Sequence, residues 1–235
     1  MALRARFIDR WAAEFLATHP DATVLHLGCG LDTRFHRLAP PPTVRWYDVD
    51  YPEVVELRGR LFPERPGYTM IGSSVTELTW LDQVPADRPV LVVAEGLLYY
   101  CAYGRAPNGP VLVTQAAASG AYSPLLDPNE APALLRAIVE RFPGGQFVFD
   151  AMNRRGLRMQ KLNRPVQKAK ATLHWSVEGP ADLEALHPRL RCRDATSAFD
   201  IDGFDRLSTP HRIVARIVEL MPGMKRTAVF YRLEF

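Results

Sequence analysis

The sequence contains little that would support a disulfide framework, a metal centre or a membrane span. Only three cysteines occur in 235 residues, Cys29, Cys101 and Cys192, and neither their odd number nor their spacing fits a disulfide or zinc pattern. The amino-terminal stretch carries Arg4 and Arg6 and lacks the apolar segment of a signal peptide, and no apolar run approaches the length of a membrane span. We therefore expect a soluble cytoplasmic protein without a structural metal.

Positive and negative side chains are nearly equal in number, and the formal net charge is +3. The basic residues that cluster fall in one segment without interleaved aromatic residues: Arg154, Arg155, Arg158, Lys161, Arg164, Lys168 and Lys170. This pattern favours a solvated helical face over nucleic-acid binding. Length and composition, with 47% hydrophobic and 23% charged residues, predict one globular domain over residues 1–235 without internal repeats.

The most informative stretch is residues 23–34. A short apolar, β-branched run ends at Gly28 and Gly30, and apolar residues then recur at helical spacing, which predicts a strand, a tight turn and a helix. Glycine lacks a Cβ, so such a turn can adopt positive φ and let a ligand approach the backbone. A dinucleotide-binding fold would require a third glycine at position 33, where this chain has Thr33.

The next predicted strand, residues 44–50, ends in Asp50, about twenty residues after the glycines. A carboxylate at this interval binds ribose hydroxyls in nucleotide-binding folds. The alternative is a helix N-cap, because Pro52 follows and is typical of a first helical turn. Together with the upstream glycines, the pattern favours cofactor binding by Asp50.

Four stretches in order, residues 27–34, 46–53, 72–75 and 94–100, resemble the successive motifs of the leucine carboxyl methyltransferase family. The resemblance extends over most of the chain and is strongest to the bacterial branch similar to the polyketide methyltransferases of tetracenomycin-type pathways. It implies a class I enzyme that uses S-adenosyl-L-methionine. The implied fold is α/β and Rossmann-like: a mostly parallel seven-stranded sheet with a C-terminal antiparallel hairpin and helices on both faces.

The resemblance also implies roles for individual residues. Gly28 and Gly30 would lie against the methionine part of the cofactor, and Asp50 would bind the ribose. An arginine on the first helix, Arg4 with Arg6 as the alternative, would bind the cofactor carboxylate. Ser74 and Val75 would contact the adenine, and a helix N-terminal turn is their structural alternative. Glu95 would lie against the cofactor, and an exposed loop acid is its structural alternative.

Further side chains are candidates for contact with the methyl acceptor. Tyr99 and Tyr100 follow the predicted fourth strand, where aromatic rings could line a methyl-transfer pocket, and core packing is equally consistent with the pattern. His174 and Trp175 are possible substrate contacts as well, although such a pair is more often structural.

Two features depart from the resembled family. Its members usually carry a further helical segment ahead of the predicted first helix, residues 3–17, and this segment helps to cover the substrate site. Residues 101–126 also have no counterpart, and a structureless loop of this length is uncommon in a compact domain. We interpret them as a poorly ordered insertion, with a substrate lid or a sequence artefact as alternatives.

The remaining pattern predicts strands at 68–71, 89–94, 146–150, 192–199 and 227–233 and helices at 54–62, 78–84, 127–139 and 213–220. The predicted function is transfer of a methyl group to a carboxyl or hydroxyl oxygen of a small molecule, with polyketide-like compounds as the leading candidates. Because the sulfonium is a strong electrophile, positioning suffices and no nucleophile–base pair is required. Alternatives are a non-catalytic cofactor-binding protein and an NAD(P)-dependent oxidoreductase, which Thr33 disfavours. The sequence leaves the oligomeric state open.

Overall fold

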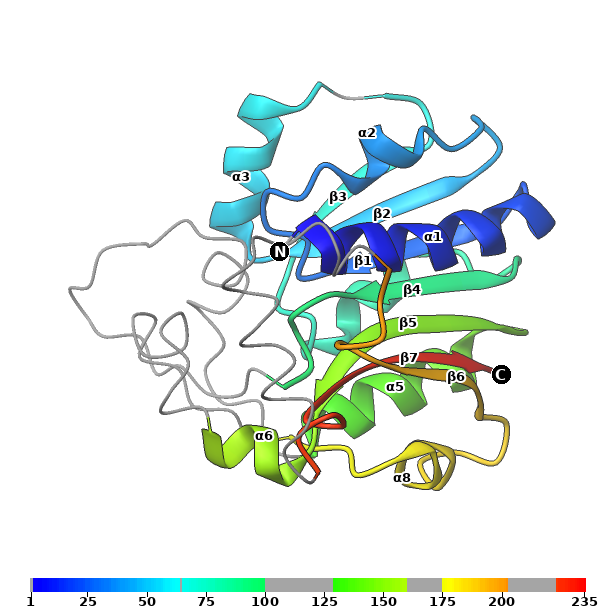
Figure 1. The fold of residues 1–235 in the computed structure, drawn as a ribbon. Helices are drawn as coiled ribbons and strands as arrows, with labels where there is room; N and C mark the ends of the chain where they lie inside the picture. Colours follow the sequence, from blue (N-terminus) through cyan, green and yellow to red (C-terminus); the bar gives the residue numbers. More distant parts are fainter. Residues whose placement is uncertain (1, 64, 100–128, 160–174, 203–222) are drawn as a thin grey trace, which may run out of the picture.

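The computed structural model describes residues 2–63, 65–99, 129–159, 175–202 and 223–235 (Figure 1). Four predictions lie wholly outside the described residues: the insertion at 101–126, the helix at 213–220, and the placement of Tyr100 and His174. The part of the predicted basic face from Lys161 to Lys170 lies outside them as well.

A seven-stranded sheet in the order β3-β2-β1-β4-β5-β7-β6 forms the centre of the molecule (Figure 1). Its strands are β1 (Thr23–Leu27), β2 (Arg45–Asp50), β3 (Tyr68–Gly72), β4 (Val90–Ala94), β5 (Gly145–Met152), β6 (Arg191–Ser197) and β7 (Ala228–Glu234). The strands from β1 to β5 are parallel, and β7 runs antiparallel between β5 and β6. The predicted mostly parallel sheet with a C-terminal antiparallel pair is confirmed.

The described helices are α1 (Ala2–Thr18), α2 (Arg34–Leu38), α3 (Pro52–Leu61), α5 (Glu130–Arg141), α6 (Arg154–Arg158), α8 (Pro180–Glu184) and the 3₁₀ segment η1 (Leu78–Gln83). The helix after the glycines is short, because the chain from Gly28 to Thr33 is taken up by the turn. None of these helices combines the length and the apolar character needed to cross a bilayer.

Alternating side chains of the strands pack into two cores, one on each face of the sheet. On one face Val24 and Leu91 pack with Phe7 and Trp11 of α1. On the other face Leu25, Val92 and Phe147 pack with the α5 residues Leu134 and Ile138. A strand that is buried on both sides requires an apolar run rather than an alternating pattern, which explains the sequence of β4. Helices therefore cover both faces, as predicted.

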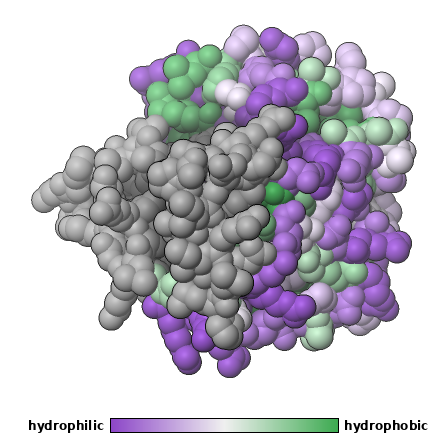
Figure 2. Space-filling view, viewed as in Figure 1, coloured by the Kyte–Doolittle hydropathy of each residue, from purple (hydrophilic) through white to green (hydrophobic). Residues whose placement is uncertain are grey.

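The large apolar side chains of the described residues lie mainly in these cores. Leu61, at 55% exposed, and Met159, at 36%, are the exceptions among them. In the view of Figure 2, the coloured surface is largely hydrophilic, with one clear apolar patch at the upper left. The basic side chains of α6, Arg154, Arg155 and Arg158, are exposed, in agreement with the predicted solvated face.

The order of the strands reverses between β1 and β4. From β1 the chain continues outward to β2 and β3, and it then returns to add β4 and β5 on the other side. Open α/β sheets bind ligands in the crevice beyond the carboxyl ends of the strands at such a reversal. We therefore expect a ligand-binding site at the carboxyl ends of β1, β2 and β4.

Gly28, directly after β1, has a backbone φ of +59°, and a Cβ added there would lie 2.8 Å from Leu97 Cδ1. Replacing Gly28 by alanine is expected to lower the free energy of unfolding by about 1–2 kcal/mol, the cost of left-handed backbone for an L-residue. Urea denaturation measures this loss.

Gly59→Ala serves as the matched control, because Gly59 lies within α3 and a Cβ there meets no atom within 4 Å. This control is expected to raise the free energy of unfolding by about 0.5–1 kcal/mol, as alanine is the better helix former. Equal effects of the two substitutions would contradict the assignment of strain to the turn.

Candidate functional site

The turn after β1 and the acid that ends β2 contact each other directly. Gly28 N–H donates to the Val49 carbonyl oxygen at 2.8 Å. Gly30, at φ +51°, donates its N–H to Asp50 Oδ2 at 2.7 Å, and Tyr51 N–H donates to Asp50 Oδ1 at 2.8 Å. Tyr51, not Asp50, occupies the N-cap position of α3. The carboxylate of Asp50 is therefore turned toward the glycine turn, and the N-cap alternative is wrong.

Asp50 is 2% exposed, and burial raises its pKa to about 6 against the lowering effect of the Gly30 and Tyr51 N–H groups. A carboxylate has about four lone-pair positions, and these two N–H groups use only two of them. Hydroxyl groups of a ligand could use the others. The local electrostatics therefore suit a ligand that presents neutral hydroxyl donors.

The back of the same turn is held by Arg58 of α3, which is fully buried. Its Nη1 donates to the carbonyl oxygens of Gly30, at 2.7 Å, and Asp32, at 2.8 Å. Its Nη2 donates to Asp48 and to the Tyr68 hydroxyl. Burial alone would raise the pKa of Asp48, but the hydrogen bond from His26, the charge of Arg58 and the hydrogen bond from Tyr68 outweigh it and hold this pKa at about 2.

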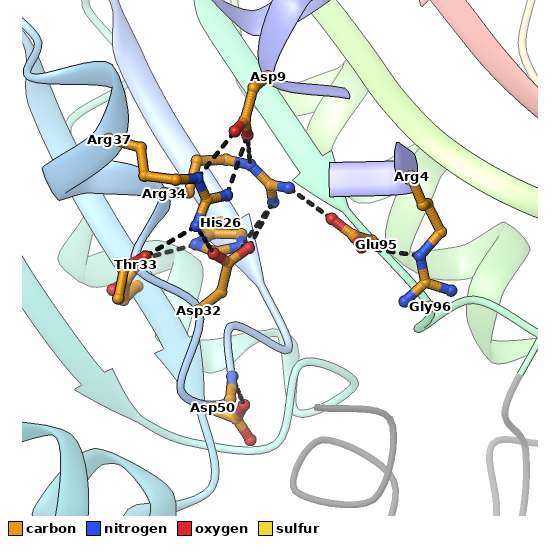
Figure 3. Close-up of polar contacts among 12 residues, drawn as sticks. Arg4, Asp9, His26, Asp32, Thr33, Arg34, Arg37, Asp50, Glu95 and Gly96 are labelled. Atoms are coloured by element: carbon orange, nitrogen blue, oxygen red, sulfur yellow. Dashed lines mark hydrogen bonds and ion pairs between the residues drawn. The ribbon is translucent and has the colours of Figure 1, made fainter. Parts of the chain in front are cut away.

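Glu95, directly after β4, lies between two arginines (Figure 3). Arg4 Nε donates to Glu95 Oε1 at 2.7 Å, and Arg34 Nη2 donates to Oε2 at 2.5 Å. The side chain of Glu95 is 10% exposed and that of Arg34 is fully buried. Arg34 also contacts Asp9 at 2.7 Å and Asp32 at 3.2 Å. Glu95 is thus a fixed acid, and the exposed-loop alternative is wrong.

Arg4 brings the first turn of α1 to the ends of β4 and β5. Its Nη1 donates to the Tyr99 hydroxyl at 3.2 Å and to Asp150 Oδ2 at 3.4 Å. Asp150 in turn accepts from Gly96 N–H at 2.6 Å and from the Tyr99 hydroxyl at 2.7 Å. Arg6, by contrast, is exposed. Of the two predicted arginines, Arg4 is the one that the structure brings to this edge.

The other predicted contacts lie in more enclosed positions. Ser74 Oγ lies 3.0 Å from Thr76 Oγ1, while the Val75 side chain is in the core and its carbonyl accepts from Trp80 Nε1 at 3.0 Å. Trp175 is 8% exposed and packs near Phe149. Their roles at the adenine and the substrate remain predictions.

The sequence interpretation gave no role to five residues that build this site: His26, Asp48, Arg34, Arg58 and Asp150. Arg34 and Asp48 stand inside motifs that were already singled out, and a charged residue flanking or within a buried strand is itself a signal. Which charge pairs with which depends on contacts between residues distant in sequence. Among the described residues, no group of three or more His, Cys, Asp or Glu side chains is arranged to hold a metal ion.

Residues 1–69 match the family model described as leucine carboxyl methyltransferase. The chain is 42% identical over 200 residues to the tetracenomycin polyketide synthesis O-methyltransferase TcmP of Streptomyces glaucescens, covering 85% of this chain and 65% of that protein. It is 31% identical over 208 residues to the S-adenosyl-L-methionine-dependent methyltransferase dpfgK of Gibberella zeae, covering 83% and 61% respectively. The chain thus spans somewhat less than two thirds of the length of these curated relatives.

Among solved structures, the fold is similar to that of the N-methyltransferase NodS from Bradyrhizobium japonicum in complex with S-adenosyl-L-homocysteine. The TM-score is 0.52 at 12% sequence identity, over 97% of this chain and 85% of that chain. At this identity the likeness shows the fold alone.

Proposed function

We propose that the chain belongs to the leucine carboxyl methyltransferase-like branch of the S-adenosylmethionine-dependent methyltransferases, as its similarity to that family model and to TcmP and dpfgK supports. It transfers a methyl group from S-adenosyl-L-methionine to a carboxyl or hydroxyl oxygen of a small molecule. The observation that carries this proposal is the buried carboxylate of Asp50, which faces the turn at Gly30 and still has lone pairs for ligand hydroxyls. The proposal treats residues 1–235 as one catalytic domain.

In this proposal the cofactor lies across the ends of β1, β2 and β4. Asp50 binds the ribose hydroxyls, and the backbone at Gly28 and Gly30 lies against the methionine part. Arg4 binds the cofactor carboxylate, and Glu95 orients Arg4, as the 2.7 Å bond between them supports. The residues present fit the group, because a carboxylate for the hydroxyls and a guanidinium for the amino-acid end stand on the same edge of the sheet.

Ser74 and Val75 complete the proposed adenine contacts, at the end of β3. Ser74 can offer its hydroxyl, which is now paired with Thr76. Val75 can offer only its backbone N–H or the edge of its side chain, because that side chain packs in the core. Tyr99, Tyr100, His174 and Trp175 are kept as proposed acceptor contacts.

The bound cofactor would supply an electrophilic methyl group on a sulfonium. The protein's own part is to orient the acceptor oxygen in line and to exclude water. A carboxylate acceptor is ionised at neutral pH and needs no base, whereas a phenol would need one nearby. The similarity to TcmP, a tetracenomycin polyketide synthesis O-methyltransferase, favours a polyketide-like acceptor. We propose the cytoplasm as the place of action.

Two measurements test the proposed function. Calorimetry with S-adenosylhomocysteine tests cofactor binding, and transfer of labelled methyl from S-adenosylmethionine to a panel of aromatic carboxylates and phenols tests catalysis. Binding with no transfer to any acceptor would support the non-catalytic alternative. Absence of binding, combined with micromolar binding of NADH, would support the oxidoreductase alternative.

The raised pKa of Asp50 predicts a pH dependence of cofactor binding. The free carboxyl titrates at about pH 6, and ligand hydroxyls bind its ionised form, so binding below this pH must release a proton. The affinity for S-adenosylhomocysteine is therefore expected to fall about tenfold per pH unit below about pH 6. Calorimetry from about pH 5 to about pH 8, a range that brackets the titration of Asp50, measures this slope.

The same pKa has the opposite effect on the unliganded fold. The folded-state pKa of about 6 lies above 3.8, the ordinary pKa of an aspartate, so the folded protein binds this proton between the two values and the unfolded chain does not. The contribution of Asp50 to the free energy of unfolding therefore rises as the pH falls through this window. Asp50→Asn removes the titrating group, and persistence of the binding slope in this variant would contradict the assignment.

A further inference from the structure

His26 lies between two charged side chains of opposite sign. It is the fourth residue of β1 and is 2% exposed. Its Nδ1 lies 3.0 Å from Asp48 Oδ1, and its Nε2 lies 3.0 Å from Arg34 Nη1. The carboxylate of Asp32 also lies near the ring, with Oδ2 at 3.8 Å from Nε2. Both partners of the imidazole are fully buried, so water cannot replace them.

This geometry fixes the protonation state of the ring. A guanidinium can only donate hydrogen bonds, so Nε2 must accept from Arg34 and carries no proton. Nδ1 must then carry the proton and donate it to the Asp48 carboxylate. His26 is thereby a neutral imidazole of one defined tautomer, with a donor on one side and an acceptor on the other.

His26 also joins two groups of contacts that belong to opposite halves of the proposed cofactor site. On one side Asp48 binds Arg58, which holds the carbonyl oxygen of Gly30. On the other side Arg34 binds Glu95, which holds Arg4. The hydrogen bonds form one continuous chain through Arg58, Asp48, His26, Arg34, Glu95 and Arg4. His26 is the uncharged link at its centre.

We propose that His26, as the neutral Nδ1–H form, is a positioning residue that fixes the ribose half and the amino-acid half of the cofactor site relative to each other. This inference rests on the proposed function. An apolar residue at position 26 would remove one of the donors to Asp48 Oδ1, which Trp46 Nε1 also contacts. It would also remove one acceptor of Arg34 Nη1, which Asp32 Oδ2 also contacts at 3.2 Å. Glutamine would keep one N–H donor and one carbonyl acceptor and would remain uncharged.

The first test is calorimetry with S-adenosylhomocysteine on the wild type, His26→Leu and His26→Gln. His26→Leu is expected to weaken binding about tenfold to a hundredfold, and His26→Gln to bind within about threefold of the wild type. Thr23→Val is the matched control on the same strand, because Thr23 is fully buried and its hydroxyl has no hydrogen-bond partner among the described residues. It is expected to leave binding unchanged.

The outcomes separate this inference from the proposed function. Absence of binding by the wild type would overturn the proposed function. Tight binding by both the wild type and His26→Leu would overturn the role of His26. Equal losses of affinity in His26→Leu and His26→Gln would overturn it as well, because a purely structural position would not be rescued by the donor and acceptor of glutamine.

The second test does not depend on the folding of His26→Leu. Nitrogen-15 NMR of the histidine rings in the wild type, with His26→Gln for assignment, reports which ring nitrogen carries the proton. We expect a protonated Nδ1 and an unprotonated Nε2, and a shift of both resonances when S-adenosylhomocysteine is added. A protonated Nε2 or a charged ring would overturn the inference. So would resonances that do not shift when S-adenosylhomocysteine binds.

Discussion

Replacing Arg34 by methionine is expected to lower the free energy of unfolding by about 3 kcal/mol, at the lower end of the range for breaking a buried ion pair. The guanidinium is fully buried and bonds to Asp9 and Glu95. Its removal leaves carboxylates in a medium that solvates them poorly. The loss stays at the lower end because Arg37 still contacts Asp9, and Arg4 still contacts Glu95.

The same substitution is expected to weaken binding of S-adenosylhomocysteine, since Glu95 would lose one of its two anchors. Arg37→Met is the matched control on the same helix. Arg37 also bonds to Asp9 and Asp32, but its side chain is 36% exposed, so its loss is expected to cost about 1 kcal/mol or less. Urea denaturation compares the two variants. A loss from Arg37→Met as large as that from Arg34→Met would show that burial does not set the cost.

Replacing Asp50 by alanine is expected to weaken binding of S-adenosylhomocysteine by about 1–3 kcal/mol, or about fivefold to 150-fold. The removed carboxylate would leave the ribose hydroxyls without acceptors. It would also leave Gly30 N–H without its partner at 2.7 Å, so part of the loss comes from the turn. Asp50→Asn keeps one acceptor oxygen and is expected to lose less affinity than Asp50→Ala.

Glu53→Ala is the control for Asp50, because Glu53 lies three residues further along the chain and is exposed on α3. Its binding is expected to equal that of the wild type. Calorimetry on all three variants, with denaturation curves to confirm folding, separates a ligand contact from general damage. Unchanged affinity in Asp50→Ala would remove the observation on which the proposed function depends.

Local sequence patterns predicted the individual helices, strands and turns well because each rule that was used acts over a few residues, whereas the resemblance supplied the arrangement of the sheet. The two glycines, at φ values of +59° and +51°, are required where the backbone turns left-handed. The apolar run of β4 reflects burial on both faces. Pro52 marks the first turn of α3. Each of these features can be recognised without knowing what lies opposite it in the fold.

The pairing of charges could not be predicted in the same way. Arg4 and Glu95 are 91 positions apart, and Arg4 and Asp150 are 146 positions apart. No local rule connects such residues, so the sequence identified Glu95 and Arg4 but not the arginine or the aspartate that hold them. The choice of Arg4 over Arg6 likewise depends on which face of α1 packs on β4 and β5.

The sequence by itself determined the order and type of the elements, the glycine turn and the acid that ends β2, because these follow from backbone sterics and from the period of apolar residues. Only the tertiary structure decided that Asp50 faces the turn rather than capping α3, and that His26 joins Asp48 to Arg34. Buried charges must be paired whichever residues supply the partners. The identity of each partner is therefore a property of the fold and not of any stretch of chain.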